Sequence, residues 1–593
     1  MYIKGLSKKW KRTHSCSEIN SNYIGEKVNL AGWVFRRRDH GGLIFIDLRD
    51  KSGIIQLVFD PKYNLTSFEI AHKLKDEYVI AVEGEVRKRP PGTENPKIST
   101  GEVEVFVDKL YILNSSLTLP FPIEDNIKVS EELRLKYRFL DLRRASIQKN
   151  FILRHRCAQI IRNFLTSLGF IEIETPFLTK STPEGARDYL IPSRVNPGKF
   201  YALPQSPQLF KQILMISGFE KYFQIVKCFR DEDLRANRQP EFTQIDLEMA
   251  FVDEDEIMEV VEKLLFLIFK EIKNIEISIP FKRISYSEAI DKFGLDAPDI
   301  RFSMQIEDIT EIGKASSFKV FREAAEIGVV KGINAKGLAT LSRKELDELV
   351  EFVKNFKAKG LAYFKIESEG KVTSPIKKFF KDGELNKIKE IFSAEEGDLL
   401  LFIGDKYEIV SEALGRLRKY LAEKYNLIKN EIPSFVWIVN FPLFERDEEG
   451  NLTPKHHPFT SPHPEDIDLL DKSPEKVRSL AYDIVLNGEE IGGGSIRISD
   501  KSLQLKIFKI LGIPEKEVNE KFGFLLSALE FGAPPHGGIA LGFDRLMMNL
   551  VESKSIKDVI AFPKTQKAIC PLTGAPSAVS EEQLKEIHIK VED

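Results

Sequence analysis

Alternating apolar and polar residues predict a pair of strands near the middle of the chain. Residues 222–251 begin and end with such alternation, which is typical of half-buried strands, and the charged stretch between the two runs cannot be core. We expect an antiparallel hairpin with Arg230 at the end of its first strand. Because side chains alternate along a strand, four residues of the second strand should share one face: Phe242, Gln244, Asp246 and Glu248. This surface is a candidate site, although a solvated charged edge would look similar.

The same alternation predicts a small all-β unit over residues 1–115. Gly, Asp and Pro turns separate strand-like runs at 28–35, 43–48, 54–59, 78–86 and 103–113. With a helical stretch near 67–74, this pattern is typical of an OB-fold, a barrel that often binds single-stranded nucleic acid. Arginines 36–38, Phe45 and Gln56 supply the groups that single-stranded RNA recognition requires. The alternative is a solvated strand end with Phe45 in the core.

The later pattern predicts a multidomain α+β protein. Residues 116–145 contain a Pro-rich hinge and a charged, helical stretch. Residues 146–296 open with an amphipathic helix that stops at Gly169, followed by an alternating strand closed by Pro176. Residues 297–427 change character, with many lysines, amphipathic helices and short strands, and we expect an inserted α+β domain without a catalytic constellation. Residues 428–593 resume the first α/β unit.

Composition excludes several classes of protein. The 593-residue chain is 42% hydrophobic and 30% charged, which is ordinary for several globular domains. A net charge of −3 gives no overall attraction to nucleic acid, so a polyanion would need local basic patches. The four cysteines lie far apart without C-x-x-C spacing, which indicates neither disulfides nor a zinc knuckle. We find no signal peptide or membrane-spanning run, so a cytoplasmic protein is expected.

Two glycine-rich stretches in the last part of the chain add candidate chemistry. Residues 482–497 alternate like a strand and then carry three consecutive glycines without G-K-[ST], so they are not a phosphate-binding Walker A loop. Glycines in a strand indicate close approach of a ligand or another backbone. Residues 535–548 read as a glycine-flanked strand that turns into a helix, with Arg545 at the junction. The adjacent His456 and His457 do not predict a zinc site.

Three separated stretches resemble the signature motifs of class II aminoacyl-tRNA synthetases. The helix and strand before Pro176 resemble motif 1, residues 229–232 with their hairpin resemble motif 2, and residues 538–545 resemble motif 3. The preceding barrel is typical of the aspartate, asparagine and lysine subgroup. Further stretches, and the insertion between motifs 2 and 3, resemble bacterial-type aspartyl-tRNA synthetases over essentially the whole chain: 182–188, 205–211, 229–235 and 239–246.

The resemblance implies an ATP site at the hairpin. Arg230, as the motif 2 arginine, would bind the α-phosphate and the aspartate carboxylate, and Arg545 would lie over the adenine as the second catalytic arginine. Glu232 would accept a hydrogen bond from the adenine amino group, with Phe242 under the ring. Other ATP contacts are expected from Asp231, Gln239, Glu490, Gly542, Phe543 and Asp544.

The resemblance also implies sites for aspartate and Mg²⁺. Arg497 and Lys211 would bind the side-chain carboxylate, which arginine can hold bidentately. Asp483 and Glu490 would hold Mg²⁺ against the phosphates, because hard cations prefer carboxylate oxygens. The other aspartate contacts are expected from Glu184, Gln205, Gln208, Arg230, Asp246 and His456.

The implied activity is a two-step attachment of aspartate to tRNA through aspartyl-adenylate, by a homodimer. Anticodon contacts are expected from Arg36, Arg38, His40, Phe45 and Gln56. His40, followed by Gly41 and Gly42, resembles relatives that charge both tRNA(Asp) and tRNA(Asn). The alternatives are an enzyme strict for tRNA(Asp), an asparaginyl- or lysyl-tRNA synthetase, an amide-forming enzyme on the same core, and a catalytically silent RNA-binding paralogue.

Overall fold

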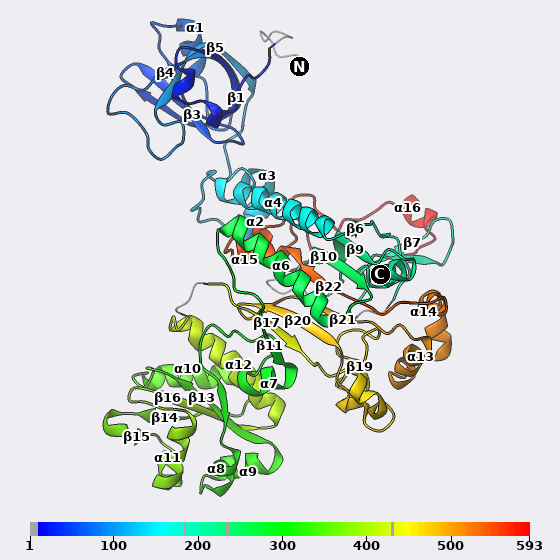
Figure 1. Cartoon of the computed structure of the whole chain (residues 1–593). Coiled ribbons are helices and arrows are strands. Elements are labelled where there is room, and N and C mark those ends of the chain that lie inside the picture. Colours follow the sequence, from blue (N-terminus) through cyan, green and yellow to red (C-terminus); the bar gives the residue numbers. More distant parts are fainter. Residues whose placement is uncertain (1–9, 183–184, 233–237, 429–431, 593) are drawn as a thin grey trace. The chain divides into compact units, whose positions relative to one another are not determined.

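The computed structural model describes residues 10–182, 185–232, 238–428 and 432–592, and divides into two compact units, Met1–Val129 and Ser130–Asp593 (Figure 1). The first unit is a closed barrel in the strand order β1-β2-β3-β5-β4, with α1 (Leu65–Ala71) before β4. Its strands are β1 (Lys27–His40), β2 (Leu43–Arg49), β3 (Ile54–Phe59), β4 (Val79–Lys88) and β5 (Val103–Asn114). The predicted OB-fold is confirmed, and alternate residues such as Ile44, Ile46 and Leu48 fill its core.

The second unit is built around an eight-stranded sheet in the order β11-β17-β20-β21-β22-β10-β9-β6. All neighbours are antiparallel except the outermost pairs at each end, β11 with β17 and β6 with β9. The strands are β6 (Ile171–Glu172), β9 (Lys221–Phe229), β10 (Glu241–Ala250), β11 (Lys282–Ser285), β17 (Phe435–Val439), β20 (Ala481–Leu486), β21 (Glu489–Ile496) and β22 (His536–Gly542). The predicted hairpin is β9 and β10, in antiparallel register from Lys221 with Met249 to Phe229 with Glu241.

One face of this sheet is covered by helices and forms the largest core. Ile245, Leu247 and Met249 of β10 point into that core, where they pack with residues of three helices. The helices are α4 (Ala145–Ser167), α6 (Glu254–Lys273) and α15 (Phe543–Leu550), and Figure 1 shows α4 and α6 side by side. Because side chains alternate, the polar residues of β10 point to the opposite face. That face carries the candidate site.

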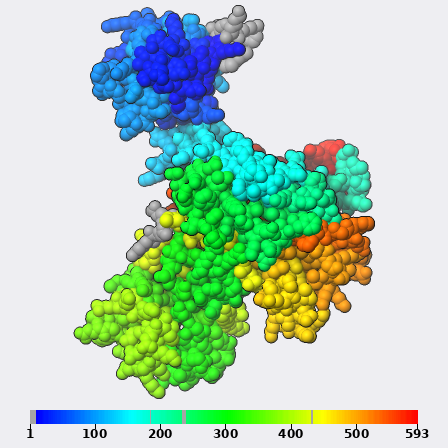
Figure 2. Space-filling model, viewed as in Figure 1, coloured from blue at the N-terminus to red at the C-terminus, as the bar shows by residue number. Residues whose placement is uncertain are grey.

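Residues 306–405 form a second sheet with its own hydrophobic cores. The strand order is β12-β13-β16-β14-β15, and the strands are β12 (Ile306–Asp308), β13 (Val329–Ala335), β14 (Ala362–Ile366), β15 (Val372–Thr373) and β16 (Leu399–Asp405). α10 (Arg343–Lys354) and α12 (Tyr407–Lys424) contribute to one core, and α8 (Thr310–Ala315), α9 (Lys319–Ile327) and α11 (Asp382–Ile391) to the other. In Figure 2 the yellow-green atoms of this segment form a lobe. The predicted inserted α+β fold is confirmed.

The remaining elements surround the large sheet. They are α2 (Glu131–Lys136), α3 (Arg138–Asp141), β7 (Leu190–Pro192), β8 (Phe200–Ala202), α5 (Gln208–Ile216), α7 (Tyr286–Phe293), β18 (Phe444–Arg446), β19 (Leu452–Pro454), α13 (Lys501–Ile510), α14 (Glu515–Leu529) and α16 (Glu581–Glu586). α7 packs beside β17 and β20, where Phe293 and Ile438 share a core. Within the described residues, no helix is long and apolar enough to span a membrane.

Candidate active site

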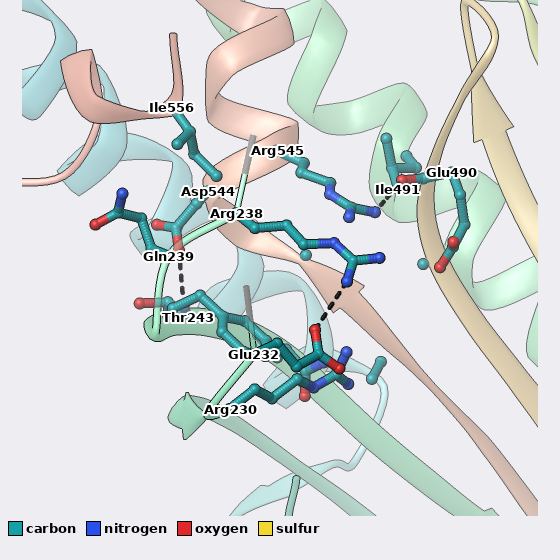
Figure 3. A pocket seen from close by; sticks show the side chains of 15 residues that line it. Arg230, Glu232, Arg238, Gln239, Thr243, Glu490, Ile491, Asp544, Arg545 and Ile556 are labelled. Atoms are coloured by element: carbon teal, nitrogen blue, oxygen red, sulfur yellow. Dashed lines mark hydrogen bonds and ion pairs between the residues drawn. The ribbon is translucent and has the colours of Figure 1, made fainter. Parts of the chain in front are cut away.

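The first pocket lies on the polar face of the sheet, between β10, β21 and the start of α15 (Figure 3). The guanidinium carbon of Arg230 lies 5.2 Å from the centre of the Phe242 ring. On the opposite side, Nη1 of Arg545 donates to the backbone carbonyl of Glu490 at 2.8 Å. Glu232 forms an ion pair of 2.8 Å with Arg238, which sequence reasoning did not single out. Two guanidinium groups and an aromatic ring thus enclose a site suited to a planar, anionic ligand.

Glycines bring the strands under this pocket close together. A Cβ on Gly494 would lie 2.1 Å from the carbonyl oxygen of Gly538 on the neighbouring strand. A Cβ on Gly493 would lie 2.4 Å from a carboxylate oxygen of Asp483. The prediction that the consecutive glycines mark a close approach is therefore confirmed, and the approaching groups are β22 and the Asp483 side chain.

A second pocket of about 340 Å³ adjoins the first and shares Arg230 and Glu490 with it. It contains a fully buried set of alternating charges. The Nζ of Lys211 lies 2.7 Å from Asp246 and 3.3 Å from Glu248. Arg497 donates from Nε and Nη2 to the two carboxylate oxygens of Glu248, at 2.9 and 3.1 Å. The structure therefore brings together Lys211, Asp246 and Arg497 as predicted, with Glu248 between the two cations.

Two histidines complete this pocket in different protonation environments. Burial and the charge of Arg497 hold the pKa of His457 well below its usual value, so its Nε2 accepts from Nη1 of Arg497 at 2.7 Å. His456 is half-buried, and removal from water lowers its pKa, but Asp483 at 3.1 Å outweighs that effect and raises the pKa of His456. One ring is therefore a neutral acceptor beside a guanidinium, and the other is biased toward the imidazolium form.

Among the residues that the structure describes, four buried polar atoms around the second pocket have no hydrogen-bond partner. They are Nε of Arg230, Nε2 of Gln208, Oδ2 of Asp246 and Nδ1 of His456. Burial raises the pKa of Asp246 to about 6, against the opposing charge of Lys211. The two donors of Arg230 and Gln208 and the carboxylate acceptor of Asp246 form a cradle for a ligand that carries both an anionic group and an N–H donor.

Two carboxylates lie where the two pockets adjoin: Glu490 lines both pockets, and Asp483 lines the second. Burial, followed by the charge of Asp483, raises the pKa of Glu490. A cation between these groups would relieve their repulsion, so the donor set fits a hard divalent ion. Among the described residues, no group of three or more His, Cys, Asp or Glu side chains is arranged to hold a metal.

Other predicted site residues have side chains engaged elsewhere. The amide of Gln239 pairs with the backbone of Lys564, at 2.7 and 3.0 Å. Gln205 bonds to the backbone of Ala186. The Phe543 ring packs in the main core, so it lines neither pocket. Asp231 is exposed and does not line either pocket, Gly542 and Asp544 line the first, and Glu184 lies outside the described residues.

The sequence did not single out several residues that line the two pockets or bind the residues that do. Glu248 was placed on the correct face but received no role, and His457 was considered only as a metal ligand. Lys455, Asp296 and Phe441 come from loops whose approach to the pocket depends on the fold around β17 and β20. The one signal available in the sequence was that His457 directly follows His456, a predicted pocket residue.

The barrel of the first unit presents a row of polar side chains on its outer surface. Arg38 donates from Nη2 to Asp47 at 2.7 Å and to Gln56 at 3.1 Å, across three adjacent strands. Phe45 is half-buried on this surface and does not belong to the core formed by its neighbours. Arg36 and His40 are exposed, and Gly41 and Gly42 have φ of 62° and 79°, as a tight hairpin turn requires.

Comparisons with known proteins agree with this architecture. Residues 130–566 match the family described as tRNA synthetases class II (D, K and N), and residues 28–113 match the OB-fold nucleic acid binding domain. The chain therefore belongs to the class II tRNA synthetases of the D, K and N group.

Two relatives are similar over nearly the whole chain. Proteins named aspartate--tRNA(Asp/Asn) ligase from Persephonella marina and Aquifex aeolicus are each 58% identical to it, over 98% of this chain and 98% of theirs. Among solved structures, asparaginyl-tRNA synthetase from Pyrococcus horikoshii, complexed with asparaginyl-adenylate, has a TM-score of 0.59 at 22% identity, covering 94% of this chain and 98% of its own. This last likeness shows the fold alone.

Proposed function

We propose that the protein attaches L-aspartate to tRNA in two steps, with ATP as co-substrate, and that it charges both tRNA(Asp) and tRNA(Asn). Class II synthetases use ATP, and the similar proteins from Persephonella marina and Aquifex aeolicus carry the name aspartate--tRNA(Asp/Asn) ligase. The observation that carries the proposal for the amino acid is the set of buried atoms in the second pocket without a partner among the described residues: Nε of Arg230, Nε2 of Gln208 and Oδ2 of Asp246.

Aspartate supplies a group for each of these atoms. Its ammonium would bind Oδ2 of Asp246, which is buried and ionised at neutral pH, since the pKa is about 6. Arg497 donates four of its N–H groups to Glu248, His457 and Ser495, and its remaining N–H would bind the side-chain carboxylate of aspartate. The charge of Lys211 would also attract this carboxylate. Lysine would place an ammonium against these cations, and asparagine would leave their charge uncompensated, so both should be rejected.

ATP would occupy the adjoining pocket. Its α-phosphate would lie at Arg230, next to the bound aspartate. The aspartate α-carboxylate would attack the α-phosphorus, and pyrophosphate would leave as aspartyl-adenylate forms. Arg230 would stabilise the charge that develops on the phosphate oxygens, and Arg545 and Phe242 would enclose the adenine. The 3′-terminal ribose hydroxyl of tRNA would then attack the mixed anhydride. No covalent enzyme intermediate is needed, so positioning and electrostatics supply the catalysis.

The acidic pair at the join would hold Mg²⁺. Asp483 and Glu490 provide carboxylate oxygens beside the space proposed for the phosphates, and their mutual repulsion supports a bound cation. Bound Mg²⁺ would neutralise phosphate charge, and two protein carboxylates are a typical number for this ion, which keeps several waters.

The barrel would bind the anticodon through Arg36, Arg38, His40, Phe45 and Gln56. The half-buried Phe45 ring offers a stacking surface, and the Arg38–Gln56 row offers hydrogen bonds to base edges. We also infer a homodimer, because apolar residues on and near the motif 1 helix are exposed, namely Ile152, Ile171, Phe177 and Leu178.

One pair of measurements tests the proposal. Purified tRNA(Asp) and tRNA(Asn) transcripts are assayed for charging with aspartate, and with asparagine as the control amino acid. Aspartylation of both supports the proposal, aspartylation of tRNA(Asp) alone removes the relaxed specificity, and aspartylation of neither contradicts it. Arg230→Ala should abolish aspartate-dependent ATP–pyrophosphate exchange while tRNA binding is kept, and retained exchange would contradict the assigned site.

A further inference from the structure

A groove lies in the lobe formed by residues 306–405, a segment that contains none of the active-site motifs. It has a volume of about 700 Å³ and lies between α9 and the residues leading into β14, over the end of β16. Its lining is mostly apolar and includes Phe318, Val320, Phe321, Ile327, Leu361 and Ile376. This size and composition are typical of binding sites for organic groups.

One of the residues that line this groove is a buried carboxylate. Asp405, the last residue of β16, has a side chain that is only 3% exposed. Its Oδ1 accepts from the backbone N–H of Lys406 at 2.8 Å, but its Oδ2 has no hydrogen-bond partner in the described part of the chain. The nearest cation is the Nζ of Lys359, 3.5 Å away on a side chain that is 79% exposed. A pair with such an exposed lysine contributes little to stability. The buried oxygen would therefore be stabilised by a closer N–H donor.

The charges around the groove exclude a nucleic-acid phosphate. Among the described lining residues, Asp405 and Glu323 provide two carboxylates against one cation, Lys359. Glu323 also forms an exposed pair with Lys319 at 3.4 Å. A phosphate here would meet a buried carboxylate at close range. A positively charged group is the complementary occupant.

The rim indicates that the occupant is larger than a simple amine. Val320 and Ile327 on α9 are 56% and 63% exposed, although both line the groove. A small amine at Asp405 would leave these side chains in water, whereas a peptide could cover them as its cationic side chain reaches the floor.

We propose that this groove binds a segment of a partner protein that carries an arginine or lysine among apolar residues. The cationic side chain replaces Lys359 at Oδ2 of Asp405, and the apolar neighbours pack on Val320 and Ile327. This site is independent of the aminoacylation chemistry, since no residue of the two active-site pockets lines it.

Fluorescence anisotropy with the full chain tests this proposal. The probe is a blocked, labelled peptide with one arginine between leucines, and its match carries neutral citrulline instead. The arginine peptide should bind about tenfold more tightly, because charge-assisted hydrogen bonds exceed neutral ones. Asp405→Asn keeps the acceptor for Lys406 but removes the charge, so it should abolish the difference between the peptides.

Lys359→Met provides the opposite prediction at an exposed position that does not threaten folding. It should tighten binding of the arginine peptide severalfold, whereas Lys344→Met on α10, on the other side of the sheet, should change nothing. Equal binding of the two peptides, or weaker binding to Lys359→Met, would overturn the proposal. Displacement of the peptide by a tRNA transcript from the wild-type chain, but not from Lys359→Met, would also overturn it, because it would assign the groove to RNA.

Discussion

Replacing Arg497 by lysine should reduce aspartate activation about a thousandfold without unfolding the protein. Arg497 donates all but one of its N–H groups to neighbours: two to Glu248, one to His457 and one to Ser495. A lysine ammonium has fewer donors and cannot hold a carboxylate bidentately. It would neutralise Glu248 but could not also reach the substrate. Losing one charged hydrogen bond and the orientation of its neighbour costs about 4 kcal/mol in the transition state, or about a thousandfold.

The assay is aspartate-dependent ATP–pyrophosphate exchange at saturating ATP, with the KM for ATP measured separately. The KM for ATP should stay within about twofold, because Arg497 does not line the ATP pocket. Arg478→Lys is the matched control, since Arg478 also holds carboxylates, those of Asp466 and Glu465, but lies outside both pockets. A loss of less than about tenfold in Arg497→Lys, or an equal loss in the control, would refute the reasoning.

Three further predictions follow from the same contacts. Because burial raises the pKa of Asp246 to about 6, its carboxylate loses its charge as the pH falls below that value. The KM for aspartate should therefore rise in acid, while kcat at saturation changes less. A KM independent of pH would contradict the assigned role. Gly494→Ala would place Cβ 2.1 Å from Gly538 and should cost about 3 kcal/mol or more in the free energy of unfolding, whereas Gly523→Ala in α14, where nothing lies within 4 Å, should be neutral or stabilising. Arg418→Met removes the donors to the backbone carbonyls of Asp299, Phe302 and Met304, so it should increase hydrogen exchange of residues 299–304 with little effect on aspartate activation. Unchanged exchange would contradict this.

The elements on which the site is built could be predicted because they follow from local patterns. The period of two along β10 places Asp246 and Glu248 on the face opposite the core, and the structure has that arrangement. The junction of β22 and α15 could be located because glycines end the strand immediately before helical spacing begins. The domain borders proposed at residues 115, 145, 296 and 427 remain predictions.

The pairing of side chains could not be predicted, because it depends on contacts far apart in the sequence. Arg497 is separated from Glu248 by 249 residues, and no local pattern fixes that ion pair. Motif resemblance likewise could not show that the amide of Gln239 is bonded to Lys564 or that Phe543 turns into the core. Each position is in the expected segment, but the side chain's direction is set by packing that the sequence does not display.

The buried charges of the second pocket are better explained by binding than by stability. Lys211, Asp246, Glu248 and Arg497 are all removed from water, and burying such groups costs several kcal/mol per ion, which their mutual attraction barely offsets. Apolar residues would pack this space more stably. Among the described residues, one oxygen of Asp246 and one N–H of Arg497 have no protein partner, so these two groups remain available to a ligand in the pocket. A bound zwitterion with a second carboxylate would complete both partnerships, and ligand binding should therefore stabilise this part of the fold by mass action.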